Sequence, residues 1–143
     1  MQSDTEFREP SDMPKLNLSD QLLISIIDDD RPFRESMRRL MKSLGYTAYI
    51  FPSAADFLAS PRFNQTSCLI ADVNMPAMTG LELFRHLIQV GHPIPTILVT
   101  AYPRQLDRTS ALREGVICYL GKPVEEPIFS RCLRAALASG DAA

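Results

Sequence analysis

The sequence predicts an α/β fold in which a five-stranded parallel sheet carries helices on both faces. Two observations support this prediction. Short apolar runs alternate with amphipathic segments five times along the chain. The strand candidates are apolar at nearly every position, which is typical of strands buried on both faces of a parallel sheet. Helices must then cover both faces of that sheet.

Five segments have the composition of buried strands. LLISII is a continuous apolar run that ends at three aspartates, and TAYIF is β-branched and aromatic. SCLIA, TILVT and VICYL are further short apolar runs. The predicted strands cover residues 22–27, 47–51, 67–71, 96–100 and 116–120.

The first two helices are predicted from capping residues and an apolar stripe. Pro32 stands near the start of the first helix, which ends at Gly45. The stripe of this helix consists of Phe33, Met37, Leu40, Met41 and Leu44. Ser53 and Asp56 predict a capping box for a short second helix that ends near residue 60.

Three more helices complete the repeats. Thr79 and Glu82 predict the cap of the third helix. Its inward face is expected to consist of Leu81, Phe84, Leu87 and Ile88. A weaker helix spans about 105–114 and ends at Gly115, and its only apolar anchors are Leu106, Ala111 and Leu112. A last helix runs from about 125 to 139, with acids in its first turn, where the helix dipole favours them.

Length and charge exclude several classes of protein. A chain of 143 residues with a net charge of −2 fits one ordinary domain, and no basic excess indicates a nucleic-acid module. Residues 1–20 are polar and charged without periodicity, so we expect a flexible tail followed by one domain over 21–140. The start of the chain is unlike a signal peptide, and no apolar stretch is long enough to cross a bilayer. We therefore expect a cytoplasmic protein that makes no membrane contact.

The three cysteines show no metal-ligand spacing. Cys68, Cys118 and Cys132 lie in or beside apolar runs. Buried cysteine behaves as a small hydrophobic side chain, so we expect three buried free thiols.

Polar residues follow four of the predicted strands. Ligands of open α/β sheets bind outside the carboxyl ends of the strands. Aspartates 28–30 follow the first strand, Asp72 and Asn74 follow the third, Thr100 ends the fourth, and the fifth leads to Lys122. Carboxylates pressed together cannot all stay ionised without a compensating cation, and oxygen ligands of this kind suit Mg²⁺. A nucleotide-binding sheet would instead show glycines or hydroxyls after its first strand.

Each of these residues also has an ordinary structural explanation when it is taken alone. Aspartate caps helices and forms turns, threonine favours strands, and most lysines lie at the solvated surface. Their shared position at the strand ends of one sheet favours a functional site.

The pattern resembles the receiver domains of bacterial two-component response regulators, most closely the FixJ-type subgroup. Receiver domains carry an acidic pair, a phosphorylated aspartate, a Thr or Ser and a Lys–Pro after strands one, three, four and five. The matching segments are IIDDD (26–30), IADVNMPAMTGLEL (70–83), ILVTAY (97–102) and CYLGKP (118–123). The resemblance covers about residues 22–139. It implies a flavodoxin-like, doubly wound (βα)5 fold with strand order 2-1-3-4-5.

The resemblance also implies the chemistry. Asp72 would accept a phosphoryl group from a sensor histidine kinase or a phosphotransfer protein. Asp29 would bind Mg²⁺ directly, Asp28 would bind it through water, and Asn74 would offer its backbone carbonyl. Asp72 would complete the metal site. Such a domain is a phosphoacceptor with slow self-dephosphorylation rather than an enzyme with turnover.

The remaining matching residues would carry the switch. Lys122 would pair with the phosphoryl oxygens, and Thr100 would donate its hydroxyl to them. Ala101 would leave room for the phosphoryl group, and Tyr119 would turn from outside to inside. The peptide bond before Pro123 would be cis. The surface made by the predicted helix 105–114, the strand 116–120 and the last helix would then rearrange, with a phosphorylation-dependent homodimer as one outcome.

Several alternatives remain open at this stage. A haloacid-dehalogenase-like phosphatase also uses a nucleophilic aspartate, Mg²⁺, a threonine and a lysine, but it needs a second aspartate where this chain has Asn74. A purely structural module of the same fold would not need the full acceptor set. The chain is either a natural single-domain regulator or the receiver part of a FixJ-type transcription regulator. The role of Asp30 is open, and basic residues 34, 38, 39 and 42 form either a solvated face or a kinase-docking strip.

Overall fold

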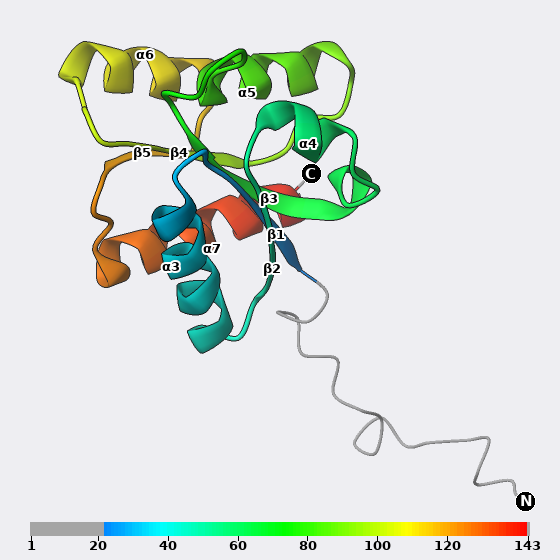
Figure 1. Ribbon diagram of the computed structural model, residues 1–143. Coiled ribbons are helices and arrows are strands. Elements are labelled where there is room, and N and C mark those ends of the chain that lie inside the picture. Colours follow the sequence, from blue (N-terminus) through cyan, green and yellow to red (C-terminus); the bar gives the residue numbers. More distant parts are fainter. Residues whose placement is uncertain (1–21, 143) are drawn as a thin grey trace, which may run out of the picture.

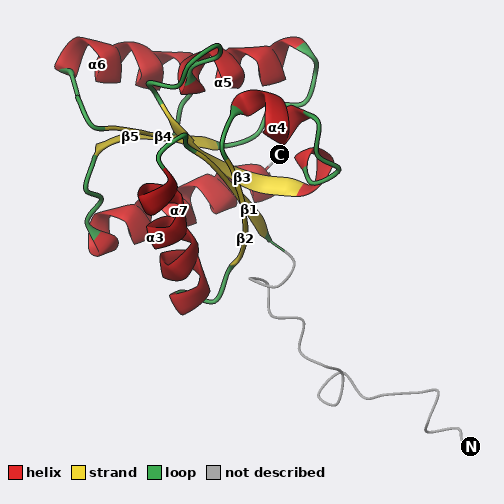
Figure 2. Ribbon diagram, in the orientation of Figure 1, coloured by secondary structure: helices red, strands yellow, loops and turns green. Residues whose placement is uncertain are grey.

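All strands of the sheet run parallel in the computed structural model, which describes residues 22–142. The strand order is β2-β1-β3-β4-β5, so the predicted order 2-1-3-4-5 and the flavodoxin-like fold class are confirmed. The strands are β1 (Leu23–Ile27), β2 (Thr47–Phe51), β3 (Thr66–Asp72), β4 (Thr96–Thr100) and β5 (Cys118–Gly121). Figure 2 shows them as one twisted layer inside the molecule. The predicted tail 1–20 lies outside the described residues.

Helices cover both faces of the sheet (Figure 1). The helices are α3 (Arg31–Ser43), α4 (Ala54–Leu58), α5 (Gly80–Gln89), α6 (Gln105–Glu114) and α7 (Glu126–Ala142), and a 3₁₀ turn, η1, covers Phe63–Gln65. Helices α4, α5 and α6 lie above the sheet in Figure 1, and α3 and α7 lie below it. None of the described helices is long and apolar enough to cross a membrane.

Each face of the sheet has its own apolar core. Phe57 of α4 and Leu83 and Leu87 of α5 pack on one face of β1, β3 and β4. The core of the other face has more buried sulfur-containing side chains, and its helix residues include Met37, Met41, Phe129, Cys132 and Leu133. The continuous burial of β1 and β4 follows from this double coverage, because every side chain of those strands meets a core.

The local signals in the sequence set the helix starts. Thr79 and Glu82 form the predicted capping box: Glu82 donates its N–H to Thr79 Oγ1 at 3.1 Å, and Thr79 donates its N–H to Glu82 Oε1 at 2.9 Å. Ser53 accepts the N–H of Asp56 at 3.1 Å and caps α4. Gly115 ends α6 with a φ of 113°, a left-handed conformation that glycine adopts without strain.

The predicted inward faces of two helices were partly wrong. Ile88 is 48% exposed, because Gly80, Leu83, Phe84 and Leu87 already fill the buried face of α5. In α6, Leu106 is 84% exposed and Leu112 is 41% exposed, so Ala111 is the only buried side chain of this helix. The apolar residues of α6 do not form one stripe, and its attachment to the sheet is correspondingly weak.

The prediction of three free thiols was also wrong. Cys118 of β5 and Cys132 of α7 form a disulfide, and their Cα atoms are 6.1 Å apart. Among the described residues only Cys68 is a free cysteine, and it is buried. The pairing follows from the packing of α7 on the sheet beside β5, which the sequence spacing of the cysteines did not reveal.

Candidate functional site

Three carboxylates meet at the carboxyl ends of β1 and β3, which lie side by side in the sheet. Each of Asp28, Asp29 and Asp72 offers one oxygen, and these oxygens lie within 4.8 Å of one another. Asp28 is fully buried and Asp72 is 5% exposed, whereas Asp29 is exposed. Oxygen ligands gathered so closely, with one of them open to solvent, fit a divalent cation that keeps some of its waters.

Lys122 provides the positive charge of the cluster. Its Nζ donates a hydrogen bond to Asp28 Oδ2 at 2.7 Å and lies 3.5 Å from Asp72 Oδ2. The same ammonium lies 4.2 Å from the centre of the Phe33 ring, a favourable cation–π distance. Lys122 therefore stands between two carboxylates and an aromatic face, with only 14% of its side chain exposed.

Burial and neighbouring charges together shift the pKa values of Asp28 and Lys122. Burial raises the pKa of Asp28, and it outweighs the hydrogen bonds from Lys122 and from the backbone of Asp30 that lower the pKa. Burial alone would lower the pKa of Lys122, but the hydrogen bond to Asp28 and the charges of Asp28 and Asp72 raise it above its ordinary value. Lys122 is therefore charged at neutral pH, and a further cation would favour the ionised form of Asp28.

The loop after β1 is held by its backbone. Asp28 donates its N–H to the carbonyl of Phe51 at 3.1 Å, and its own carbonyl accepts from Arg34 Nη1 at 2.7 Å. Asp30 donates its N–H to Asp28 Oδ1 at 2.9 Å. The side chain of Asp30 makes no capping bond to α3, but its carbonyl accepts the N–H of Arg34 at 3.0 Å, and its charge helps to raise the pKa of Lys122.

The loop after β3 holds Asp72 in a fixed orientation. Asn74 donates its N–H to Asp72 Oδ1 at 3.1 Å, and Val73 donates its N–H to the carbonyl of Val99 at 2.8 Å. Ala77 has a φ of 69°, the only positive φ of a residue other than glycine in the described chain. Gly80 starts α5 against the end of β3, and a Cβ atom there would lie 2.5 Å from the Asp72 carbonyl oxygen.

Thr100 is buried at the end of β4, beside the carboxylates. Its hydroxyl oxygen accepts hydrogen bonds from Asn74 Nδ2 and from the N–H of Tyr102, both at 3.0 Å. These bonds use both lone pairs of the hydroxyl. Within residues 22–142 no hydrogen bond takes up its proton, which leaves the hydroxyl free to donate to an incoming group.

Tyr119 differs from the expectation that its ring lies outside before phosphorylation. The residue is 3% exposed, so the ring already lies inside. The ring packs in the core beneath α5 and α6, and its hydroxyl accepts the N–H of Arg104 at 3.4 Å. Ala111 of α6 belongs to the same core. Ala101 is exposed beside Thr100, and the Lys122–Pro123 peptide bond is cis, as the resemblance implied.

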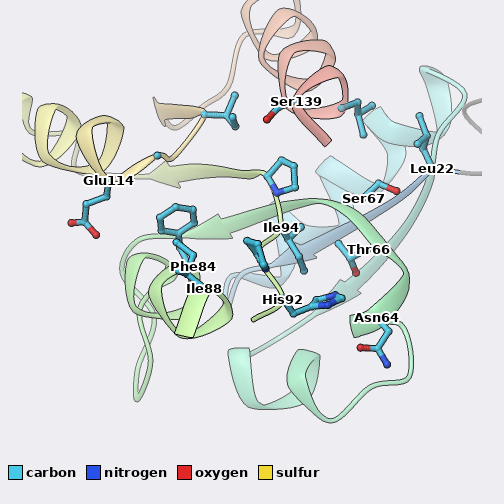
Figure 3. A pocket seen from close by; sticks show the side chains of 15 residues that line it. Leu22, Asn64, Thr66, Ser67, Phe84, Ile88, His92, Ile94, Glu114 and Ser139 are labelled. Carbon is cyan, nitrogen blue, oxygen red and sulfur yellow. The ribbon is translucent and has the colours of Figure 1, made fainter. Parts of the chain in front are cut away.

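A sizeable cavity lies at the other end of the sheet. It has a volume of about 550 Å³ and is lined by the residues before β1, β4 and β5, by parts of α5 and by the end of α7. Figure 3 shows Leu22, Phe84, Ile88 and Ile94 around it, together with polar side chains such as His92. No aspartate lines this cavity, so its size does not mark the site of the acidic chemistry.

Three contributors to the site were missed in the sequence. Phe33 and Gly80 were noted only as a core position and as part of a motif, yet they contact Lys122 and approach Asp72. Arg34 was grouped with a basic strip, yet it holds the Asp28 carbonyl. Phe33 and Arg34 lie shortly after the acidic run, at the start of a predicted helix. This position was the only signal in the sequence that they contribute to the site.

Comparisons with known proteins agree with this geometry. A family model described as "Response regulator receiver domain" matches residues 24–133. The response regulator protein TodT of Pseudomonas putida is 34% identical over 115 residues, which cover 80% of this chain and 51% of TodT. The chain thus spans about half the length of this curated relative.

Two solved structures are similar over most of their length. FixJ-N has a TM-score of 0.74 and 27% sequence identity, and the match covers 82% of this chain and 94% of that one. A response regulator receiver protein from Burkholderia phymatum has a TM-score of 0.70 and 34% identity, covering 82% of this chain and 95% of that one.

Proposed function

This chain belongs to the response regulator receiver domain family, and from that premise we propose that it accepts a phosphoryl group on Asp72. One observation carries the proposal. Asp72 is a nearly buried carboxylate at the end of β3, with Asp28, Asp29 and Lys122 converging on it. The donor would be a phosphohistidine of a sensor histidine kinase or of a phosphotransfer protein.

The transfer needs an oriented carboxylate more than a strong nucleophile. Asp72 Oδ1 is held by the N–H of Asn74, so Oδ2 is the oxygen that would attack phosphorus. The bond between phosphorus and the donor imidazole breaks as the new O–P bond forms, and the imidazole leaves with its electron pair. The aspartyl phosphate that results is a mixed anhydride, which makes the modification reversible.

Mg²⁺ is the cation that fits the site. Asp28, Asp29, Asp72 and the backbone carbonyl of Asn74 would hold it, since oxygen atoms of three carboxylates already lie within 4.8 Å of one another. When bound, it would neutralise charge on the carboxylates and on the transferred phosphoryl group.

Lys122 and Thr100 would bind the phosphoryl oxygens. Lys122 is 3.5 Å from Asp72 Oδ2 and would exchange its bond with Asp28 for a phosphoryl oxygen. The free hydroxyl proton of Thr100 would make a second bond, and the small side chain of Ala101 would leave room for the group. Asn74 stands where an aspartate would be needed for rapid hydrolysis. We therefore propose slow self-dephosphorylation rather than phosphatase turnover.

The output of the switch would be the surface of α6, β5 and α7. Helix α6 has one buried side chain, Ala111, so small forces at Thr100 can move it. Since the Tyr119 ring already lies inside, the proposed change is a shift of α6 over this ring rather than its rotation. A partner protein or a second copy of the chain would bind the shifted surface. The matched segment covers 51% of TodT, so about half of that relative lies outside the match.

The chemistry of the modified residue tests this proposal. Borohydride reduces an aspartyl phosphate to homoserine, whereas it leaves phosphoserine and phosphohistidine unreduced. After incubation with acetyl phosphate and Mg²⁺, reduction and peptide mass mapping should find homoserine at position 72 alone. Homoserine at position 28 or 29 instead would overturn the assignment of Asp72.

A further inference from the structure

Two cysteines join the strand and the helix that frame Lys122. Cys118 starts β5 and Cys132 lies in α7, and their sulfur atoms are bonded across 14 residues of sequence. A Cα separation of 6.1 Å lies within the range that disulfides use without backbone movement. Helix α7 runs beneath the sheet in Figure 1, on the same face as α3.

The two cysteine residues differ in their exposure to solvent. Cys132 is 8% exposed and belongs to the core beneath the sheet, whereas Cys118 is only partly buried at the edge of that core. A small oxidant or reductant can therefore reach Cys118 first. Solvent access of this kind, rather than packing, distinguishes reactive cysteines from structural ones.

The third cysteine provides an internal contrast. Cys68 has no exposed surface in β3, and burial raises the pKa of its thiol to about 12. It stays protonated and inaccessible in the folded protein, so it can neither attack an oxidant nor exchange with a disulfide. Of the three cysteines, only the pair from β5 and α7 is placed for redox chemistry.

We propose that Cys118 and Cys132 form a reversible thiol–disulfide site that fastens α7 to β5. With a hydroperoxide as oxidant, the Cys118 sulfur attacks the peroxide oxygen and becomes a sulfenic acid, with release of the first water or alcohol. The Cys132 sulfur then displaces the hydroxyl group as water and forms the S–S bond. The two thiols lose two electrons and two protons in total, and the peroxide takes up both. A dithiol reductant reverses the step.

The loop that this bond closes contains Tyr119 and Lys122. The oxidised protein therefore holds the segment between β5 and α7 more firmly than the reduced protein does. If the proposed phosphoryl transfer to Asp72 is correct, this restraint acts on the lysine that receives the phosphoryl group. This last consequence rests on the proposed function, whereas the redox site itself does not.

Counting free thiols tests the site. The full chain is treated with dithiothreitol or with hydrogen peroxide, then denatured, alkylated with iodoacetamide and weighed intact. Because the chain has three cysteines, the reduced protein should carry three labels and the oxidised protein one, located at Cys68. Weighed before alkylation, the oxidised protein should have lost two hydrogens, with no oxygen added at any cysteine, and dithiothreitol should restore all three labels. Three labels after oxidation, or peptide masses that place oxygen atoms on Cys118 and Cys132 instead of a bond between them, would overturn the proposal.

Matched variants distinguish the Cys118–Cys132 pair from the buried thiol of Cys68. After oxidation, Cys118→Ser should keep two labels and Cys68→Ser should keep none. Cys132→Ser should keep only the Cys68 label, because the sulfenic acid formed on Cys118 has no partner thiol to displace its hydroxyl group. Oxidation should also raise the melting temperature of the wild type by about 10 °C, from the length of the closed loop and the average entropy of unfolding. Cys118→Ser should show no such rise. Equal melting of oxidised and reduced wild type would show that the bond does not fasten α7 to β5. Because these readouts need no phosphate, they fail or succeed independently of phosphorylation at Asp72.

Discussion

Replacing Gly80 with alanine tests how tightly α5 is packed against the end of β3. The added Cβ atom would lie 2.5 Å from the Asp72 carbonyl oxygen and 2.9 Å from Leu98 Cδ2. Ordinary contacts to a carbon atom need a separation about 1 Å larger than the first of these distances. The leucine end can rotate away, but the obstacle at Asp72 is backbone, so β3 or α5 must shift.

Two opposing effects set the change in the free energy of unfolding for Gly80→Ala. Alanine is a better helix former than glycine by about 1 kcal/mol, whereas overpacking in a filled interior costs about 1–3 kcal/mol. Because the close contact involves backbone, we expect the upper end of this range and a net loss of about 2 kcal/mol. With a urea m-value of about 1.5 kcal/mol per M for a domain of this size, the unfolding midpoint should fall by more than 1 M.

Urea unfolding followed by far-ultraviolet circular dichroism measures the loss of stability for Gly80→Ala. Gly91→Ala is the matched control, since its Cβ would meet nothing within 4 Å while its φ of 78° costs about 1 kcal/mol. Only Gly80→Ala should also slow phosphorylation by acetyl phosphate, because its forced shift moves Asp72. A Gly80→Ala protein that matched the wild type both in stability and in its rate of phosphorylation would refute this reasoning.

Further predictions address the metal, the core, the surface and the buried thiol. Asp29→Ala should remain folded by circular dichroism and lose Mg²⁺ binding in a calorimetric titration; unchanged affinity would contradict its role. Phe129→Ala should cost about 3–5 kcal/mol in urea unfolding, since the side chain is fully buried. Arg85→Ala should cost less than about 1 kcal/mol at low salt and nothing measurable in 1 M salt, because the Arg85–Glu114 pair is exposed. Cys68 should resist alkylation at pH 8 in the folded protein, as its raised pKa keeps the thiol neutral until the pH approaches 12, and labelling there before unfolding would contradict its burial.

Most of the fold was predictable because local signals were mutually consistent. The strand at 96–100 and the helix at 105–114 have the predicted bounds, and the Thr79–Glu82 capping box forms as expected. Apolar runs, caps and glycine ends are short-range features, so a single sequence contains them completely. The residues of the acidic site were predictable for a related reason, since parallel strands bring their carboxyl ends to one edge.

The predictions from the sequence that were wrong concerned packing between elements distant in the chain. The orientations of Ile88 and Leu106 depend on which side chains fill the helix–sheet interface first, and the sequence does not rank them. The Cys118–Cys132 bond and the inward Tyr119 ring depend on the distance between α7, α6 and β5, which no local pattern encodes. The contact of Phe33 with Lys122 joins residues far apart in sequence and was invisible for the same reason.

The central claim is that Asp72 is the phosphoryl acceptor of a cation-dependent site. Intact mass measurement after incubation with acetyl phosphate tests it most directly, with wild type, Asp72→Asn and wild type plus a metal chelator in parallel. We expect a gain of one phosphoryl group in the wild type with Mg²⁺. We expect no gain in Asp72→Asn and little or none with the chelator. The same mass gain in Asp72→Asn, or an undiminished gain without Mg²⁺, would contradict it.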